Sequence, residues 1–418
     1  MRLSLLSFLA IPFTFITFCV AGVSEIKPVK AASFSVVAEG LDNVRGLSFG
    51  PDGSLYITEA GVGGNQLCTP SLKESVPNQF DCIGTSGAIT RIKDGKQERV
   101  LTGLPSQALS PIGAQGVGAS DIQFDRSGNP YLLIGFASNV NYNNTPLNSP
   151  NWGQLYKVDF NTGTLTSIAD ISSYKLVTNP NGIFPNGDLA SNPYTFTIQG
   201  DTAYIADAAG DDVLSVKLDG SNLTTVTTLP GQTITNPILP SPEASPAPIP
   251  QEIQVASVPT GVAIGPDQAL YVSQLTGFPS PEGKASIFRI EPDGKATVYA
   301  DGFTQLTDLS FDSKGNLYAL QFANQPFYNK GNFDGSLIQI APDGTRTTLL
   351  SGNGLESATA LTIGPDGAIY VSTKGDRAGV GQVLRVDNSA KVPEPSSAIA
   401  VIALGVGVGS FLKRKRCG

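Results

Sequence analysis

The absence of histidine limits the chemistry open to this chain of 418 residues. It removes Ser-His-Asp and Cys-His nucleophilic machinery, imidazole general acid or base catalysis, and His-ligated zinc or copper. Carboxylate and lysine chemistry are left. Asp121 and Asp308 are the carboxylates of interest, because both lie where a repeated segment begins, and Arg45 opens the first copy of that segment. Gathered in one funnel, they predict a small-ligand or Ca²⁺ site, with the carboxylates as oxygen ligands and Arg45 orienting an anion.

Three further polar residues open other copies of the segment and belong to the same candidate site: Tyr194, Thr260 and Thr359. The structural alternative is that each Asp or Thr caps its own strand through local hydrogen bonds to the backbone, as short polar side chains often do. Both interpretations stay open at the level of sequence.

The elements that must position these residues are six copies of one motif, a pair of short apolar strands joined by a turn. The clearest copies are Gly46–Ile57, Gly261–Val272 and Ala360–Val371, and looser copies are Asp121–Leu132, Asp308–Ala319 and Thr195–Ile205. Pro-Asp-Gly in the turn supplies a fixed φ, a side-chain acceptor and a residue that tolerates positive φ. Each copy is therefore a hairpin, and a second hairpin follows most copies, which gives a four-stranded blade.

Strand counting predicts how the ring closes. The sixth copy provides a third strand at Gln382–Val386 but no fourth, whereas Phe34–Ala38 precedes the first copy without a partner. Pairing the two leaves no open sheet edge. The fold class is thus all-β, a six-bladed β-propeller whose last blade is closed by the N-terminal strand. A β-sandwich with incidental turn motifs is the alternative.

Both ends of the chain differ from the repeats. An apolar run from Leu3 to Val23 follows Arg2 and predicts a secretory signal peptide over residues 1–31, with Ala21 as an earlier cleavage site. Residues 32–391 form the propeller. Residues 392–418 contain Pro393, Glu394 and Pro395, then a short apolar segment and a basic cluster. This order resembles PEP-CTERM sorting signals, which implies an exosortase-type sorting machinery as partner. An unprocessed C-terminal anchor is the alternative.

Charge and cysteine content support an exported domain. The whole chain has a net charge of −8, and the part between its two basic ends is more acidic still. Such a surface repels nucleic acid. Cys68 and Cys82 are the only cysteines between the two ends, and in an oxidising compartment they are expected to form a disulfide. A cysteine-based metal site is not expected, since no histidine and no second cysteine pair accompany them.

Long loops on the face of the candidate site combine asparagine with aromatic residues. Rings and amides suit sugars or planar aromatic ligands; the alternative is that the rings pin the loops to the body. The candidate aromatics are Trp152, Phe278, Phe327 and Tyr328. Residues 230–259 hold eight prolines and are interpreted as an extended linker.

Phrases outside the generic repeat carry a family resemblance: Ser86-Gly-Ala-Ile-Thr-Arg91, Ala119-Ser-Asp-Ile122, Ser191-Asn-Pro-Tyr194 and Val272-Ser-Gln-Leu-Thr-Gly-Phe-Pro279. Together with the opening segment they resemble the ScyD/ScyE family over about Phe34–Val386. That resemblance implies an association with the extracellular pigment scytonemin and brings no catalytic motif. The repeat is also similar to NHL-type and gluconolactonase-like propellers, but the glutamate of the metal-binding lactonases has no counterpart at Arg45 and Gly46.

These observations predict an exported, membrane-sorted binding or accessory protein of the periplasm, cell envelope or cell exterior, first held at the inner membrane by its C-terminus. Its ligand would be a small molecule, a glycan or a protein, with a role in pigment or exopolysaccharide assembly. No cofactor is expected beyond an optional Ca²⁺. The alternative function is a carboxylate and metal-dependent hydrolase or lactonase that uses Asp121 and Asp308. The sequence leaves the oligomeric state open.

Overall fold

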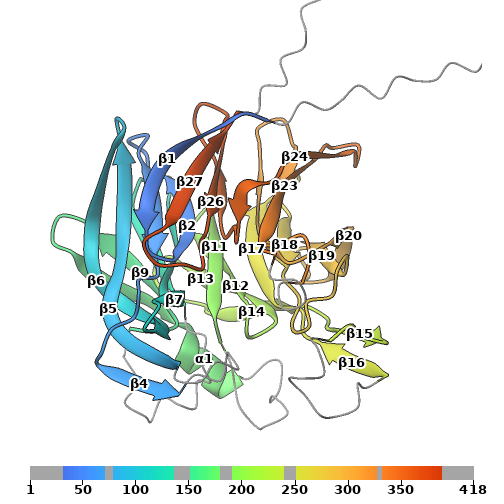
Figure 1. Ribbon diagram of the computed structural model, residues 1–418, viewed down its shortest axis with the longest axis horizontal. Helices are drawn as coiled ribbons and strands as arrows, with labels where there is room; N and C mark the ends of the chain where they lie inside the picture. Colours follow the sequence, from blue (N-terminus) through green and yellow to red (C-terminus); the bar gives the residue numbers. More distant parts are fainter. Residues whose placement is uncertain are drawn as a thin grey trace, which may run out of the picture. The chain divides into compact units, whose positions relative to one another are not determined.

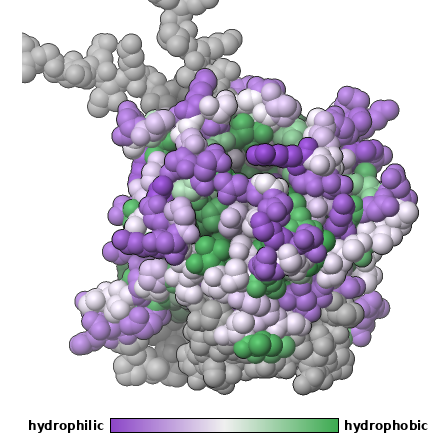
Figure 2. All heavy atoms as spheres, turned by 180° about the vertical axis from the view of Figure 1, so that it is seen from behind, coloured by the Kyte–Doolittle hydropathy of each residue, from purple (hydrophilic) through white to green (hydrophobic). Residues whose placement is uncertain are grey.

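A computed structural model describes residues 32–70, 79–135, 151–178, 191–239, 251–326 and 332–387. These residues contain 27 β-strands and one α-helix. Antiparallel sheets stand side by side around a common centre in a propeller-like arrangement (Figure 1). The predicted all-β propeller architecture is therefore confirmed. On the face shown in Figure 2, hydrophilic residues are interspersed with smaller apolar areas.

Four of the sheets have four strands each and match four of the sequence repeats. Within each sheet the chain runs outward from the centre, so consecutive strands are neighbours. The first of these sheets contains β11 (Pro193–Gln199), β12 (Thr202–Asp207), β13 (Asp212–Lys217) and β14 (Thr224–Thr228). The second contains β17 (Pro259–Ile264), β18 (Leu270–Gln274), β19 (Ala285–Ile290) and β20 (Ala296–Phe303), and the third contains β21 (Leu306–Phe311), β22 (Leu317–Gln321), β23 (Asp334–Ile340) and β24 (Arg346–Glu356). The fourth contains β25 (Leu361–Ile363), β26 (Ile369–Thr373), β27 (Gly381–Val386) and, from the N-terminus, β1 (Phe34–Leu41).

The first two repeats share one nine-stranded sheet instead of forming two separate ones. The reason is the length of β5 (Phe80–Lys93) and β6 (Lys96–Ser110), which extend far enough for β6 to pair with the start of β7 (Ala114–Phe124). The other members are β2 (Val44–Phe49), β3 (Leu55–Glu59), β4 (Leu67–Pro70), β8 (Pro130–Ile134), β9 (Gln154–Asp159) and β10 (Thr164–Asp170). The expectation of a separate sheet for every repeat is thus wrong for these two.

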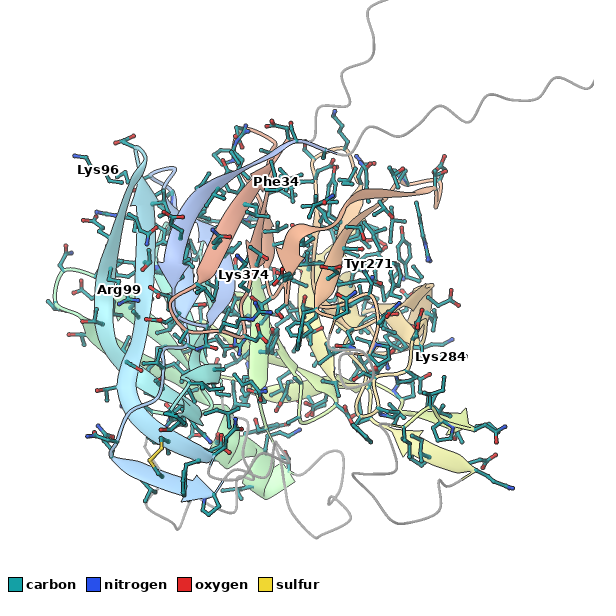
Figure 3. All side chains as sticks on the ribbon, viewed as in Figure 1. Phe34, Lys96, Arg99, Tyr271, Lys284 and Lys374 are labelled. Atoms are coloured by element: carbon teal, nitrogen blue, oxygen red, sulfur yellow. A yellow bond between two sulfur atoms is a disulfide. The ribbon has the colours of Figure 1, made fainter. Side chains whose placement is uncertain are left out.

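The predicted pairing between the two ends of the propeller is confirmed. Strand β1 runs antiparallel to β27, with Phe34 opposite Val386 and Leu41 opposite Gly381. Phe34 is labelled in Figure 3, beside the end of β27. The N-terminal strand therefore completes the sheet that the last repeat begins.

The repeated aspartate and tyrosine stabilise the hairpin turn and the contact between neighbouring sheets. Asp312 accepts hydrogen bonds from the backbone N–H groups of Lys314 and Asn316 at 2.9 Å and from the Tyr318 hydroxyl at 3.0 Å. Equivalent bonds join Tyr271 to Asp267 and Tyr370 to Asp366. Ring contacts at 4.9 Å between centroids then link repeats: Tyr56 to Phe124, Tyr271 to Phe311, and Tyr370 to Phe49. The motif thus encodes both its own turn and the next interface.

Two segments extend beyond the repeats. Strands β15 (Gln232–Thr235) and β16 (Glu252–Val255) pair as an antiparallel ribbon, so the interpretation as an extended linker is wrong for these two segments, and residues 240–250 lie outside the described residues. Alternating Thr and Ile in β15 favour a strand over polyproline geometry. The helix α1 (Ile171–Thr178) follows β10.

The predicted disulfide between Cys68 and Cys82 is confirmed, with an S–S distance of 2.00 Å. It joins two residues that face each other in the β4–β5 pair and is drawn in yellow in Figure 3. None of the helices within the described ranges is long and apolar enough to span a membrane. The proposed signal peptide, the sorting motif and the apolar tail segment lie outside the described residues.

Candidate functional site

A cavity of about 430 Å³ lies at the end of the central channel where the first strands of the repeats begin. This volume is in the range of ordinary small-ligand pockets, about 300–1,000 Å³. Six of its polar side chains come from the same position of successive repeats: Arg45, Ser120, Tyr194, Thr260, Thr307 and Thr359. Other polar residues also line the cavity: Asn192, Thr276, Ser280 and Gln305. Apolar side chains complete the wall, among them Val117, Val258, Leu275, Phe278 and Phe322.

The structure separates the six predicted channel residues into two groups. Arg45, Tyr194, Thr260 and Thr359 all line the cavity, as expected from their place in the repeats. Asp121 and Asp308 are not among the lining residues. The two carboxylates on which the metal hypothesis rests are therefore behind the wall of the cavity, and their own contacts show why.

Each carboxylate holds the backbone of the neighbouring inner strand. Asp121 in β7 accepts hydrogen bonds from the N–H of Phe196 in β11 at 3.0 Å and from the N–H of Ile122 at 2.8 Å. Asp308 in β21 accepts the N–H of Leu361 in β25 at 2.7 Å and that of Leu309 at 2.8 Å. This agrees with the structural alternative, except that each Asp binds the next strand around the ring as well as its own.

Two glycines make room for these carboxylates. A Cβ on Gly46 in β2 would lie 2.7 Å from the Cα of Asp121, and a Cβ on Gly261 in β17 would lie 2.7 Å from the Cα of Asp308. No side chain tolerates such an approach. Gly46 and Gly261 are therefore required where inner strands converge, which explains the glycine that opens these copies of the repeat.

Burial raises the pKa of both carboxyl groups. For Asp121 burial raises the pKa to about 7, against the lowering effect of the hydrogen bonds from Phe196, Gln123 and Ile122. For Asp308 burial raises it to about 8, with a further rise from the nearby Asp121 charge. Within the described part of the chain, no Lys or Arg forms an ion pair with either group. Among the described residues, no group of three or more Cys, Asp or Glu side chains is placed to hold a metal ion.

Hydroxyl groups form a second set of links, which runs around the whole channel. In each link a Ser or Thr hydroxyl donates to a backbone carbonyl of the next inner segment, so that most of these side chains have no spare proton. The six links are Thr359 to Val44, Thr58 to Ser120, Ser120 to Tyr194, Thr195 to Thr260, Thr260 to Leu306, and Thr307 to Ala358. We call this closed set the hydroxyl girdle. Thr260 and Thr359 belong to it although they also face the cavity.

Among the described residues, Arg45 is the only charged one that lines the cavity. Its guanidinium donates to the carbonyl oxygen of Gly116 from Nη2 at 2.6 Å and from Nε at 3.2 Å, and to that of Gly375 from Nη1 at 3.1 Å. These carbonyls orient the group without neutralising its charge, and within the described ranges no carboxylate forms an ion pair with it. Of the five N–H donors of a guanidinium, two are left.

Tyr194 supplies the second uncommitted polar group. Its hydroxyl lines the cavity and has no hydrogen-bond partner among the residues that the structure describes. Burial raises the pKa of this phenol, the Arg45 charge lowers it, and Asp308 and Asp121 raise it further. The phenol is thus neutral at physiological pH and can donate one hydrogen bond.

The four candidate loop aromatics lie in different places. Phe278 lines the cavity and is 56% exposed. Trp152 does not line it: it is buried in a core cluster with Ile134 and Tyr156, where its large ring packs among residues of the first two repeats. The alternative, that aromatics pin the loops, therefore holds for Trp152. Phe327 and Tyr328 lie outside the described residues.

A buried ionic cluster beside the cavity was missed by sequence reasoning. Lys175 of α1 is buried and forms a 2.8 Å ion pair with Asp212. Asp207 accepts the N–H of Asn192 at 2.6 Å, and Asp211 accepts the N–H of Val258 at 2.7 Å. Because Asn192 and Val258 line the cavity, this cluster fixes one part of its wall. The sequence signal for this cluster was the presence of three aspartates around one turn: Asp207, Asp211 and Asp212.

No family model matches this chain, and no curated protein sequence matches it. Solved structures with a similar fold include a gluconolactonase from Xanthomonas campestris, with 12% identity, a TM-score of 0.48, and coverage of 85% of this chain and 90% of that one. Regucalcin, a calcium-binding protein from Agrobacterium tumefaciens, has 11% identity, a TM-score of 0.46, and coverage of 85% and 95%. Virginiamycin B lyase from Staphylococcus aureus has 13% identity, a TM-score of 0.41, and coverage of 85% and 99%. Likenesses at this level carry no conclusion about activity.

Proposed function

We propose that this chain is a ligand-binding propeller that takes a small molecule in the channel cavity and does not catalyse a reaction there. The observation that carries the proposal is the division of the polar groups at this end of the channel. The girdle hydroxyls and both buried carboxylates are committed to the backbone, whereas Arg45 and Tyr194, which line the cavity, have donors left. The described lining combines one cation, one phenol, several neutral polar side chains and apolar residues, so it can bind and orient a ligand, and none of these described residues is a carboxylate or histidine that could act as a general base.

We also propose six blades. The hydroxyl girdle supports this count, because its six links join six successive inner segments and the last returns to the first. In the nine-stranded sheet, β2-β3-β5-β6 and β7-β8-β9-β10 are two successive runs of four antiparallel strands, joined only by the extension of β6. Counting these runs as two blades gives one blade for every copy of the sequence repeat.

The binding function can be tested with 2-naphthamide, a neutral ligand of the right chemistry for an apolar wall, titrated calorimetrically into the full chain. Leu275→Trp fills the cavity and should abolish the binding. Val298→Trp is the matched control, since Val298 is exposed on the outer strand β20. Absence of binding to the wild type, or equal binding to both variants, would contradict the proposal.

The alternative function, a carboxylate and metal-dependent hydrolase or lactonase, requires Asp121 and Asp308 to coordinate a cation. Each would first have to release the backbone N–H of the next inner strand. We therefore expect CaCl₂ or EDTA to leave the thermal midpoint of the protein unchanged. A rise with CaCl₂ that disappears in Asp308→Asn would restore the alternative.

For location, we propose an exported protein with a processed PEP-CTERM-like tail, handled by an exosortase-type machinery and serving pigment or exopolysaccharide assembly as in the ScyD/ScyE family. The strand directions support a tethered binding protein. First strands begin at the cavity end, so β27, a third strand, ends at the opposite end, where Phe34 pairs with Val386. A tether that continues from Asp387 thus leaves the propeller away from the cavity.

The tail can be tested by Glu394→Ala, which changes neither hydrophobicity nor the basic cluster substantially. A peptidase that reads the motif should fail on the variant, so the mature wild-type protein should be smaller on intact-mass analysis. Equal masses would show a plain anchor.

A further inference from the structure

We infer that the cavity selects an apolar monoanion, a carboxylate or a comparable single negative charge on a ring-bearing body, and that Arg45 determines this selectivity. The inference rests on the proposed binding function and goes beyond it, because it names the chemical class of the ligand. Three features of the cavity lead to it: the state of its one cation, the state of its hydroxyls and the nature of its wall.

The cation is positioned but not neutralised. Arg45 is half-buried and fixed by three hydrogen bonds to the carbonyls of Gly116 and Gly375. Partial burial strengthens its attraction for an anion, since the local dielectric is lower than that of water. Two N–H donors are left for a ligand, which matches a single carboxylate group. The orientation by carbonyls means that little rotamer entropy is lost on binding.

A larger anionic charge is disfavoured. Arg45 is the only cation in the described lining of the cavity, and Asp121 and Asp308 lie behind its wall. A dianion such as a phosphomonoester would have one charge without a partner, at the cost of its desolvation. A cationic ligand would face Arg45 with no carboxylate in the lining to oppose the repulsion.

The girdle hydroxyls are poor partners for a sugar, so that among the lining threonine hydroxyls it is Thr276, whose Oγ1 is buried with no partner among the described residues, that could serve one. Thr260, Thr307 and Thr359 donate their protons to backbone carbonyls in the girdle. A polyol needs several uncommitted partners, and buried hydroxyls without partners are costly. Val117, Val258 and Leu275 offer apolar contact, and the aromatic rings of Phe278 and Phe322 border the same space. The wall therefore suits the flat apolar part of a ligand, and the Tyr194 hydroxyl can donate one hydrogen bond to its anionic end.

The experiment compares three ligands of nearly the same size by calorimetric titration of the full chain: 2-naphthoate, 2-naphthamide and 2-naphthylmethylammonium. We expect naphthoate to bind about tenfold or more tightly than naphthamide, as a charge-assisted hydrogen bond replaces a neutral one. The ammonium ligand should bind most weakly. Equal affinity of naphthoate and naphthamide for the wild type would overturn the inference and leave the proposed binding function standing. Failure of all three ligands to bind would refute both.

The variants assign the selectivity to its residue. Arg45→Gln should remove the preference, so that the variant binds naphthoate and naphthamide about equally. Arg45→Lys keeps the charge but loses the paired donors, so it should retain part of the preference for naphthoate. It replaces Arg45→Gln as the test if that variant folds poorly. Tyr194→Phe should weaken naphthoate only a few fold. A preference for naphthoate that survives in Arg45→Gln would show that another group selects the anion, and the inference would be wrong.

Discussion

At one end of the channel, two sets of polar residues occupy equivalent places in the repeats and have opposite states. Asp121, Asp308 and the hydroxyl girdle have their hydrogen-bonding groups paired with the backbone of the next inner strand. Arg45 and Tyr194 retain donors that face the cavity. The first set closes the ring, and the second is available to a ligand. Residue type and position in the repeat are therefore a poor guide to function. The hydrogen-bond partners of each side chain separate the two sets.

Ring closure should have the largest effect on this division, because every girdle link depends on it. A chain that begins after Ala38 loses the part of β1 that pairs with Val386, Arg385 and Leu384. We expect it to lose cooperative unfolding and to expose the edge of β27. Circular dichroism and thermal melting would measure this. A chain that begins at Ala32, without the expected signal peptide, is the control, and melting of the shorter chain like the control would contradict the closed ring.

Removal of a structural carboxylate should come next. Asp308→Ala leaves the N–H groups of Leu361 and Leu309 without their acceptor, and we expect unfolding to become easier by about 2–4 kcal/mol. Naphthamide binding to the folded fraction should persist. Asp343→Ala, in an exposed turn, is the control and should change stability little. Denaturant titration would measure both variants. A loss of binding without a loss of stability would move Asp308 into the ligand set.

The sequence predicts the scaffold well because the repeat contains its own determinants. The Asp and Tyr of one copy stabilise its turn, and that Tyr packs on a Phe of the next copy, so local pattern and tertiary contact agree. The closing pair of strands followed from counting alone. The sequence also brought Arg45, Tyr194, Thr260 and Thr359 to one cavity, because strands that start in equivalent places start at the same end of a ring.

The sequence could not predict how those residues are used. The partner of Thr359 is the carbonyl of Val44, 315 positions away in the chain, and such links follow from the angle between sheets rather than from any motif. The sequence around Asp121 would be the same whether its carboxylate bound a cation or accepted the N–H of Phe196. Trp152 looked like a loop aromatic because the sequence does not show that its ring packs into the core cluster of the first two repeats.

A single girdle link should have a smaller effect than a carboxylate. Thr58 donates to the carbonyl of Ser120 at 3.0 Å and accepts the N–H of Gly46 at 2.7 Å, and its side chain does not line the cavity. Thr58→Val has nearly the same shape, so the loss of about 1–3 kcal/mol that we expect comes from the unpaired backbone groups. Thr224→Val on the exposed strand β14 is the control. Equal stability of the two variants in urea would show that the girdle contributes nothing.

The smallest expected effect is a dependence of stability on pH that belongs to the structural set alone. A carboxyl group whose pKa is higher in the folded than in the unfolded state binds its proton more tightly when folded, so the stability it contributes is present at low pH and is lost as the pH rises through the folded pKa. Burial raises the pKa of Asp308 to about 8. Between pH 7 and 8 the wild type should therefore lose about 1 kcal/mol of unfolding free energy through this group. Asp308→Asn cannot ionise and should lose correspondingly less over the same interval, while Arg45→Gln, in the ligand set, should keep the wild-type slope. Urea titrations at the two pH values would measure the slopes, and identical slopes for wild type and Asp308→Asn would mean that Asp308 is already ionised at pH 7 and that its hydrogen bonds from Leu361 and Leu309 outweigh its burial.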